Sequence, residues 1–232
     1  VQGSNLALAL AWEKGKTTWG IIGQSFEGSY TTSHTADVGG SVLTVNSAGD
    51  LKQRDAGLFA RHRPDDSGRY WQALVKGGQS KNEFKADNAH GGSRFRSDRD
   101  LFGLSLGGGF VKETAPNRSL ESYQHLVYTR LGSDRVTDSI GRLVAGVRRT
   151  VEREGKPSFY AGAALDYEFR GKTGATIDGD KADGANLKGL SGVVEVGFSA
   201  RQSDTLTLEG ALYGYAGKKE GLAGSLTLSK KF

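Results

Sequence analysis

The 232-residue sequence has no cysteine, no methionine, only three prolines and no long run of apolar residues. Without cysteine, the chain forms no disulfide and has no thiol chemistry. No stretch approaches the ~18 consecutive apolar residues that a membrane-spanning helix needs, which excludes an α-helical span. A membrane β-barrel is not excluded, because each of its strands needs only about ten residues with every second one apolar.

The N-terminal stretch VQGSNLALALAWEKG lacks both a basic segment ahead of its apolar residues and an A-x-A cleavage site. It therefore does not read as a signal peptide. Because an initiating methionine is also missing, we expect a mature or excised piece of a longer protein.

The formal net charge of +5 and the sequence pI near 9.3 raise the question of a nucleic-acid partner. The 31 Lys and Arg are spread among 26 Asp and Glu, and no basic stripe with interleaved aromatic residues is present. We expect no nucleic-acid binding.

What the sequence does contain is alternation of apolar with small or polar residues. In 193–201, one face carries Val194, Val196, Phe198 and Ala200, and the other carries Glu195, Gly197, Ser199 and Arg201. The segments 159–170, 205–216 and 221–232 alternate in the same way, and a period of two predicts β-strands. Several apolar stripes run over eight to ten residues, longer than a soluble sandwich needs. Glycine, serine and isolated charges on the opposite faces favour a water-filled lumen, while a soluble all-β protein remains an alternative class.

Twelve strands are expected, and tight turns alternate with long connections between them. The expected strands are 5–14, 17–27, 41–52, 55–63, 69–78, 99–111, 120–131, 142–152, 158–170, 191–201, 205–216 and 221–232. The tight turns are 63–68, 154–157 and 201–204, with 112–119 as a longer connection on the same side, and the long ones are 80–98, 171–189 and 217–221. This pattern predicts a transmembrane antiparallel up-and-down β-barrel with long extracellular loops and short periplasmic turns. Aromatic residues near strand ends, including Trp12, Trp19, Tyr70 and Trp71, are expected to form interfacial girdles.

Several segments resemble a known family. SLESYQHLVYTRLGSD, SFYAGAALDYEFRG, VEVGFSARQSDTLTLEGALYGYAGKK and the terminal Phe232 follow, in order and spacing, the strands of the C-terminal translocator barrel of autotransporters, the type V secretion family. The resemblance covers residues 55–232. Three residues depart from the family pattern: Ser122 replaces a proline, Gly107 a lumen-facing glutamate, and Lys230 an aromatic residue.

The resemblance implies that residues 1–232 form one translocator domain of the bacterial outer membrane, without its passenger and signal peptide. Such a barrel anchors an N-terminal passenger and helps to export it to the cell surface, with no enzymatic activity. Its implied partners are outer-membrane lipids and lipopolysaccharide, the barrel-assembly machinery and its own passenger, and it is expected to be a monomer. The implied barrel-assembly signal consists of Leu226, Leu228, Lys230 and Phe232.

Parity, meaning whether a residue falls on the odd or the even positions of its strand, decides which face of the sheet it lies on. It places six charged residues in the expected lumen: Glu121, Asp166, Glu168, Glu195, Arg201 and Glu209. Hydrated charge of both signs there would let a polypeptide slide. Twelve strands would leave room for one helix or a hairpin of extended chain. Two alternatives stay open. In the first, the charges only solvate a closed interior. In the second, the chain is a stand-alone outer-membrane channel or adhesin barrel.

No motif predicts catalysis, a metal or a cofactor. GLSLGGGF lacks the Gly-Lys-Ser/Thr of a phosphate-binding loop, and DGDKADG fails the spacing of a calcium loop. The histidines, His34, His62, His90 and His125, have no paired spacing. Asn5, where self-cleavage at the passenger junction is conceivable, lacks the supporting junction motif.

Overall fold

The computed structural model describes residues 2–38, 41–87, 93–132, 136–177, 180–183, 188–203 and 205–230. Every element in this part of the chain is a β-strand, and none of the described residues forms a helix that could span a membrane. The strands are β1 (Gln2–Lys14), β2 (Thr17–Val38), β3 (Ser41–His62), β4 (Arg69–Asp87), β5 (Ser93–Ala115), β6 (Arg118–Gly132), β7 (Val136–Arg153), β8 (Lys156–Ile177), β9 (Asp180–Asp183), β10 (Gly189–Arg201), β11 (Leu206–Gly217) and β12 (Gly221–Lys230).

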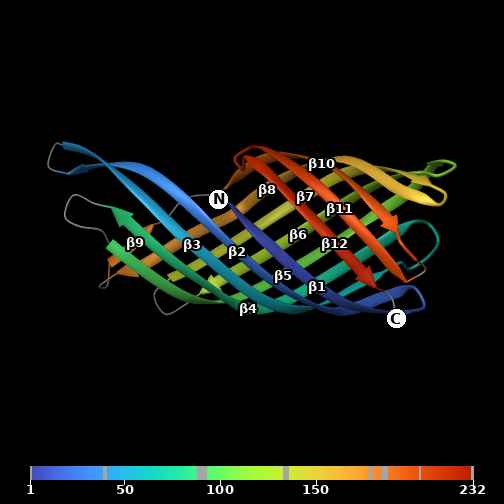
Figure 1. Ribbon diagram of the computed structural model, residues 1–232, viewed down its shortest axis with the longest axis horizontal. Coiled ribbons are helices and arrows are strands. Elements are labelled where there is room, and N and C mark those ends of the chain that lie inside the picture. The colour runs from blue at the N-terminus through green and yellow to red at the C-terminus, as the bar shows by residue number, and fades with distance from the viewer. Residues whose placement is uncertain are drawn as a thin grey trace.

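Eleven strands form one sheet in which each strand pairs antiparallel with the next along the chain, and the short β9 pairs only with β8. The sheet curls into a barrel of tilted strands (Figure 1). The expected antiparallel up-and-down barrel is thus confirmed. The expected count of twelve becomes eleven, because the expected strands 41–52 and 55–63 are one strand, β3, with an unbroken register against β2.

The expected break at 53–54 falls in the charged run Lys52–Gln53–Arg54–Asp55, which lies within β3. Its side chains find partners on neighbouring positions instead of ending the strand. Lys52 Nζ lies 3.8 Å from Glu27 Oε1 on β2, and Gln53 Nε2 donates to Asp55 Oδ2 at 2.8 Å. No glycine or proline occurs in the run to turn the chain.

The two faces of the sheet have opposite chemistry, as the alternation predicts. On β10, the outward Val194 and Val196 are 62% and 54% exposed, whereas Glu195 between them is 4% exposed. The same contrast recurs on other strands, since apolar side chains such as Leu165 and Leu212 are exposed on the outside, whereas carboxylates such as Asp166 and Glu168 are buried on the inside. This distribution is the reverse of that in a soluble sandwich, where apolar faces pack together.

At one end of the barrel, two-residue turns at 15–16, 116–117 and 154–155 join adjacent strands. Each contains a residue with positive φ, namely Gly15, Asn117 and Gly155, as the tight turns of antiparallel hairpins require. The expectation of a longer connection at 112–119 is wrong, because β5 and β6 extend to leave only Pro116 and Asn117 between them.

The connection at 63–68 is the longest at this end. The hydroxyl and the backbone amide of Ser67 both donate hydrogen bonds to Asp65 Oδ1, and the amide bond is 3.0 Å long. These hydrogen bonds hold the pKa of the Asp65 carboxyl below its ordinary value.

At the other end, the strands extend into segments that were expected to be loops. Strand β4 continues to Asp87, β5 begins at Ser93, and β8 continues to Ile177. The expected loops 80–98 and 171–189 are therefore strand over much of their length. Polar residues can continue a strand here because each faces a paired neighbour.

The edge strands β1 and β12 lie next to each other where the barrel closes (Figure 1). Because eleven strands alternate in direction, the first and the last run the same way. Among the described residues no pairing register joins β1 to β12, whereas every other strand on the path pairs on both sides. Each edge strand therefore keeps one row of backbone N–H and C=O groups that no described strand satisfies.

Candidate functional site: the charged interior of the barrel

A network of charged side chains crosses the interior from β4 to β10. Arg148 on β7 donates from Nε and Nη2 to the two carboxylate oxygens of Glu195 on β10, both at 2.9 Å. Its Nη1 lies 3.4 Å from Glu121 Oε2 on β6, and Tyr70 on β4 donates to Glu121 Oε1 at 2.5 Å. The guanidinium thus joins β6, β7 and β10, and Glu121 extends the network to β4. A bidentate pair of this kind is geometrically specific and roughly twice as strong as a neutral hydrogen bond.

Aromatic rings surround the network. Tyr123 donates to Glu195 Oε1 at 3.3 Å, and Arg148 lies over the Tyr160 ring at 4.6 Å from its centroid. On β3, Arg61 lies over Tyr70 at 4.0 Å. Cations stacked on ring faces are attracted by the ring quadrupole. The expected place of Tyr70 in an interfacial girdle is therefore wrong, because its ring is buried inside the barrel.

Glycines stand opposite the interior tyrosines on the neighbouring strands. Gly109 faces Tyr70, Gly146 faces Tyr123, and Gly197 pairs with Tyr160. A Cβ atom at any of the three would collide with the ring beside it. The tyrosines can thus lie flat against the wall, which keeps the interior open around the charged network.

A second cluster lies on β2, β3 and β4. Lys76 Nζ donates to Asp55 Oδ2 at 3.2 Å and to Gln24 Oε1 at 3.0 Å. Asp55 is buried, and its Oδ1 has no hydrogen-bond partner among the described residues. This cluster fixes the wall between β2 and β4.

A third cluster lies toward the end of the barrel opposite the two-residue turns. Lys219, in the turn between β11 and β12, lies 3.2 Å from Asp166 Oδ2 and 3.0 Å from Glu168 Oε2. Arg142 on β7 also reaches Asp166 Oδ2, at 3.4 Å. Asp166 therefore has a cation from β7 and another from the β11–β12 turn, and Glu168 shares the second of these.

The six residues predicted from parity separate into three groups. Glu121 and Glu195 share Arg148, and Asp166 and Glu168 share Lys219. Arg201 and Glu209 join neither cluster. Within the described part of the chain, Glu209 accepts a 3.4 Å hydrogen bond from the Ser199 hydroxyl, and Arg201 is exposed at the end of β10.

Sequence reasoning missed the partners that organise these acids, which are Asp55, Tyr70, Lys76, Arg148 and Lys219. Parity was a usable signal for the first four, because each alternates with outward apolar residues on its strand. Lys219 lies in a turn, where parity says nothing.

The residues of the expected barrel-assembly signal lie on or beyond β12. Leu226 and Leu228 project outward and are exposed. Lys230 ends the strand, and its side chain, like the whole of Phe232, lies outside the described part of the chain.

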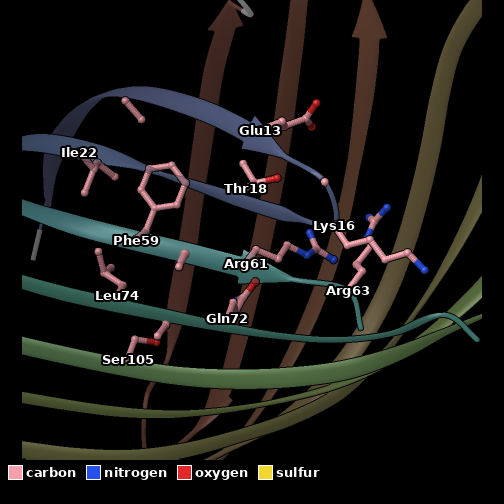
Figure 2. A pocket seen from close by; sticks show the side chains of 14 residues that line it. Glu13, Lys16, Thr18, Ile22, Phe59, Arg61, Arg63, Gln72, Leu74 and Ser105 are labelled. Atoms are coloured by element: carbon pink, nitrogen blue, oxygen red, sulfur yellow. The ribbon is translucent and has the colours of Figure 1, made fainter. Parts of the chain in front are cut away.

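An interior cavity of about 610 Å³ lies near the end with the two-residue turns. Figure 2 shows Lys16, Arg61 and Arg63 grouped toward one end of this cavity, with Ile22, Phe59 and Leu74 toward the other. Glu13 from β1 adds one carboxylate. The cavity thus has a charged and an apolar part.

No group of three His, Asp or Glu side chains within the described ranges is close enough to hold a metal ion. The carboxylates of the central network are instead held by arginine and tyrosine donors. These charge-assisted hydrogen bonds organise the interior of the barrel.

The sequence matches no protein-family model and no curated protein. The fold, in contrast, matches solved structures. The chain is similar to the transport unit of the autotransporter AIDA-I from Escherichia coli, with a TM-score of 0.72 and 14% identity over 98% of this chain and 81% of that one.

Two further structures are similar. The translocator domain of the autotransporter NalP from Neisseria meningitidis gives a TM-score of 0.70 and 18% identity, covering 99% of this chain and 81% of that one. The beta domain of the Bordetella autotransporter BrkA gives 0.58 and 14%, with 99% of each chain covered. The chain therefore has the fold of autotransporter translocator barrels.

Proposed function

We propose that this chain is a bacterial outer-membrane barrel that anchors an N-terminal passenger and helps to export it through the barrel interior. The observation that carries the proposal is the inverted distribution of side chains, with exposed valine and leucine outside and fixed charges inside. A lipid environment accounts for the outer face, and a hydrated path accounts for the inner one. The fold shared with autotransporter translocators supports export as the use of that path.

The interior suits an extended polypeptide in transit. Charges of both signs alternate along the wall, and most are already paired with a neighbour, as Glu195 is with Arg148. Paired charges keep the wall hydrated without holding a passing side chain tightly. On this proposal Glu121, Asp166, Glu168, Glu195, Arg201 and Glu209 line the lumen and have no catalytic role.

The proposed partners follow from the same assignment. Lipids and lipopolysaccharide would cover the outer face, and the assembly machinery would recognise the end of β12 through Leu226, Leu228, Lys230 and Phe232. The barrel would act as a monomer, with the passenger as part of the same polypeptide. Residues 1–232 would be the translocator domain alone.

The absence of cysteine from the chain makes a direct test of export possible. A signal peptide and an unstructured reporter with a single cysteine are fused ahead of Val1 and expressed in a Gram-negative host. We expect a membrane-impermeant maleimide to label the reporter on intact cells, because the segment has passed to the outside. Deletion of residues 221–232, which removes β12, is the control and should abolish labelling.

The outcome that contradicts export is specific. If the barrel is present in the outer membrane and its folded form migrates differently before and after heating, but the reporter is labelled only after lysis, the barrel is a membrane channel that does not export the segment.

A further inference from the structure

The turn between β11 and β12 is folded onto the start of β10. The Lys218 amide donates to the Leu190 carbonyl at 3.1 Å, and the Lys219 amide donates to Ser191 Oγ at 2.8 Å. The Ser191 side chain is buried beneath the turn. These two contacts direct the Lys219 side chain across β10 toward β8.

The ammonium of Lys219 lies between two carboxylates. Asp166 and Glu168 are two positions apart on β8 and therefore share one face of the strand. Both side chains are 2% exposed, whereas Lys219 is 31% exposed. The acids thus lie deep in the site, and the lysine covers them from the solvent side.

The site has acceptor capacity that Lys219 does not use. Among the described residues, Asp166 Oδ1 and Glu168 Oε1 are buried without a hydrogen-bond partner. An unpaired buried polar atom is costly, and a buried charge without a counter-ion more so. If Lys219 moved away, Arg142 at 3.4 Å from Asp166 Oδ2 would be the one remaining cation there among the described ion pairs, and none would reach Glu168.

Lys219 is the member of this cluster that can move. Arg142 belongs to a strand paired on both sides, whereas Lys219 lies in a short turn joining β11 to the edge strand β12. An ammonium is a compact charge with three rotatable donors, so another ammonium can take its place without a special approach geometry.

We propose that Asp166 and Glu168 form a binding site for a primary ammonium group, filled by Lys219 in the resting barrel and open to a lysine side chain of a passing segment when the β11–β12 turn lifts. The ligand class follows from the two carboxylates and the ammonium between them. That the natural ligand is a lysine in transit rests on the proposed export function.

Binding is tested on the refolded full chain in detergent, with spermidine as the probe and calorimetry and thermal unfolding as the readouts. The Lys219→Gln variant frees the carboxylates, and we expect its Kd for spermidine to be about tenfold lower than that of the unaltered chain. Spermidine should also raise its unfolding temperature. Lys218→Gln is the matched control, because it removes the same charge from the same turn and should leave spermidine binding unchanged.

A second variant identifies the acids. Adding Glu168→Gln to Lys219→Gln should return spermidine binding to the level of the unaltered chain, and a change in gel mobility on heating verifies that each variant is folded. If Glu168→Gln does not fold, Asp166→Asn in the same background replaces it. Equal spermidine affinity in Lys219→Gln and Lys218→Gln, or full binding after the acid is neutralised, overturns the site.

Two capped Gly-Ser peptides, one with a single lysine and one with glutamine at that position, test the natural ligand. Only the lysine peptide should bind Lys219→Gln. Binding of spermidine without binding of the lysine peptide overturns the assignment to a side chain in transit. Because these measurements need no membrane or passenger, loss of the site with export intact, and loss of export with the site intact, are separate results.

Discussion

Arg148 is the single residue on which the central network depends, because it is the common partner of Glu121 and Glu195. Arg148→Met should therefore lower the free energy of unfolding by about 2–3 kcal/mol, somewhat below the range for a fully buried pair, because its side chain is 30% exposed. Urea unfolding of the refolded barrel in detergent measures this.

The neighbouring Arg149 provides the control, since it lies on the outward face of the same strand. Arg149→Met should leave the free energy of unfolding nearly unchanged. If both substitutions destabilise equally, the network makes no contribution beyond the loss of a surface charge. Combining Arg148→Met with Glu195→Gln should recover part of the lost stability, because one uncompensated charge is then removed.

Parity on β8 gives a second prediction at this scale. Leu165 is 57% exposed on the outward face, and Ala164 faces the interior beside Gly146. Leu165→Arg should cost ~2–4 kcal/mol in lipid if the residue lies near the bilayer midplane, and Ala164→Arg should cost less because its charge can reach water. Unfolding in lipid vesicles compares the two, and the reverse order would contradict the assigned faces.

At the scale of strands, alternation was enough to predict where most elements lie and which way they face. Strand ends were harder. The expected break at 53–54 lies in a charged run, but cross-strand partners satisfy the flanking Lys52 and Asp55 and the strand continues. Strands β4 and β5 continue into an expected loop in a similar way, with Arg96 Nε 3.7 Å from Glu83 Oε1, and β8 continues through its backbone pairing with β7.

The charged clusters inside the barrel could be predicted only in part, because the sequence does not show how neighbouring strands are aligned. Parity puts Glu195 and Arg148 on the same face, but only the register of β7, β8 and β10 brings the two side chains together. Register is set by the lengths of the connections, and the expected turn 154–157 and loop 171–189 both differ from the strand ends in the structure. A one-residue change in register moves every side chain of a strand to the other face.

The edge strands give a prediction at the same scale. Strand β1 pairs only with β2, and β12 only with β11, in the described part of the chain. In an antiparallel edge strand about half of the amides point away from the single neighbour, so these should exchange with deuterium much faster than amides of β6 or β7. Exchange measured by mass spectrometry on the refolded barrel checks this. Slow exchange along all of β1 and β12 would mean that another strand pairs with both edges.

For the whole molecule, the central question is what the residues at the end of the last strand, β12, contribute to folding and to assembly. Leu226 and Leu228 lie on the outward face of β12, in line with the expected alternation that leads to Lys230 and Phe232. Removing one terminal aromatic residue loses buried apolar area that is worth at most ~1–3 kcal/mol of the free energy of unfolding. On physical grounds alone the deletion of Phe232 should therefore be mild, and the chain should still refold in detergent.

Assembly in cells depends on recognition as well as on folding free energy. If the assembly machinery reads the end of β12, deletion of Phe232 should sharply lower the amount of barrel in the outer membrane while refolding in detergent remains efficient. Lys230→Tyr, which restores an aromatic residue, should leave the membrane level equal or higher. Outer-membrane fractions probed on gels before and after heating measure both variants against the unaltered chain. A normal membrane level after deletion would show that Phe232 is an ordinary strand end, and equal failure in cells and in detergent would show that its contribution is to stability.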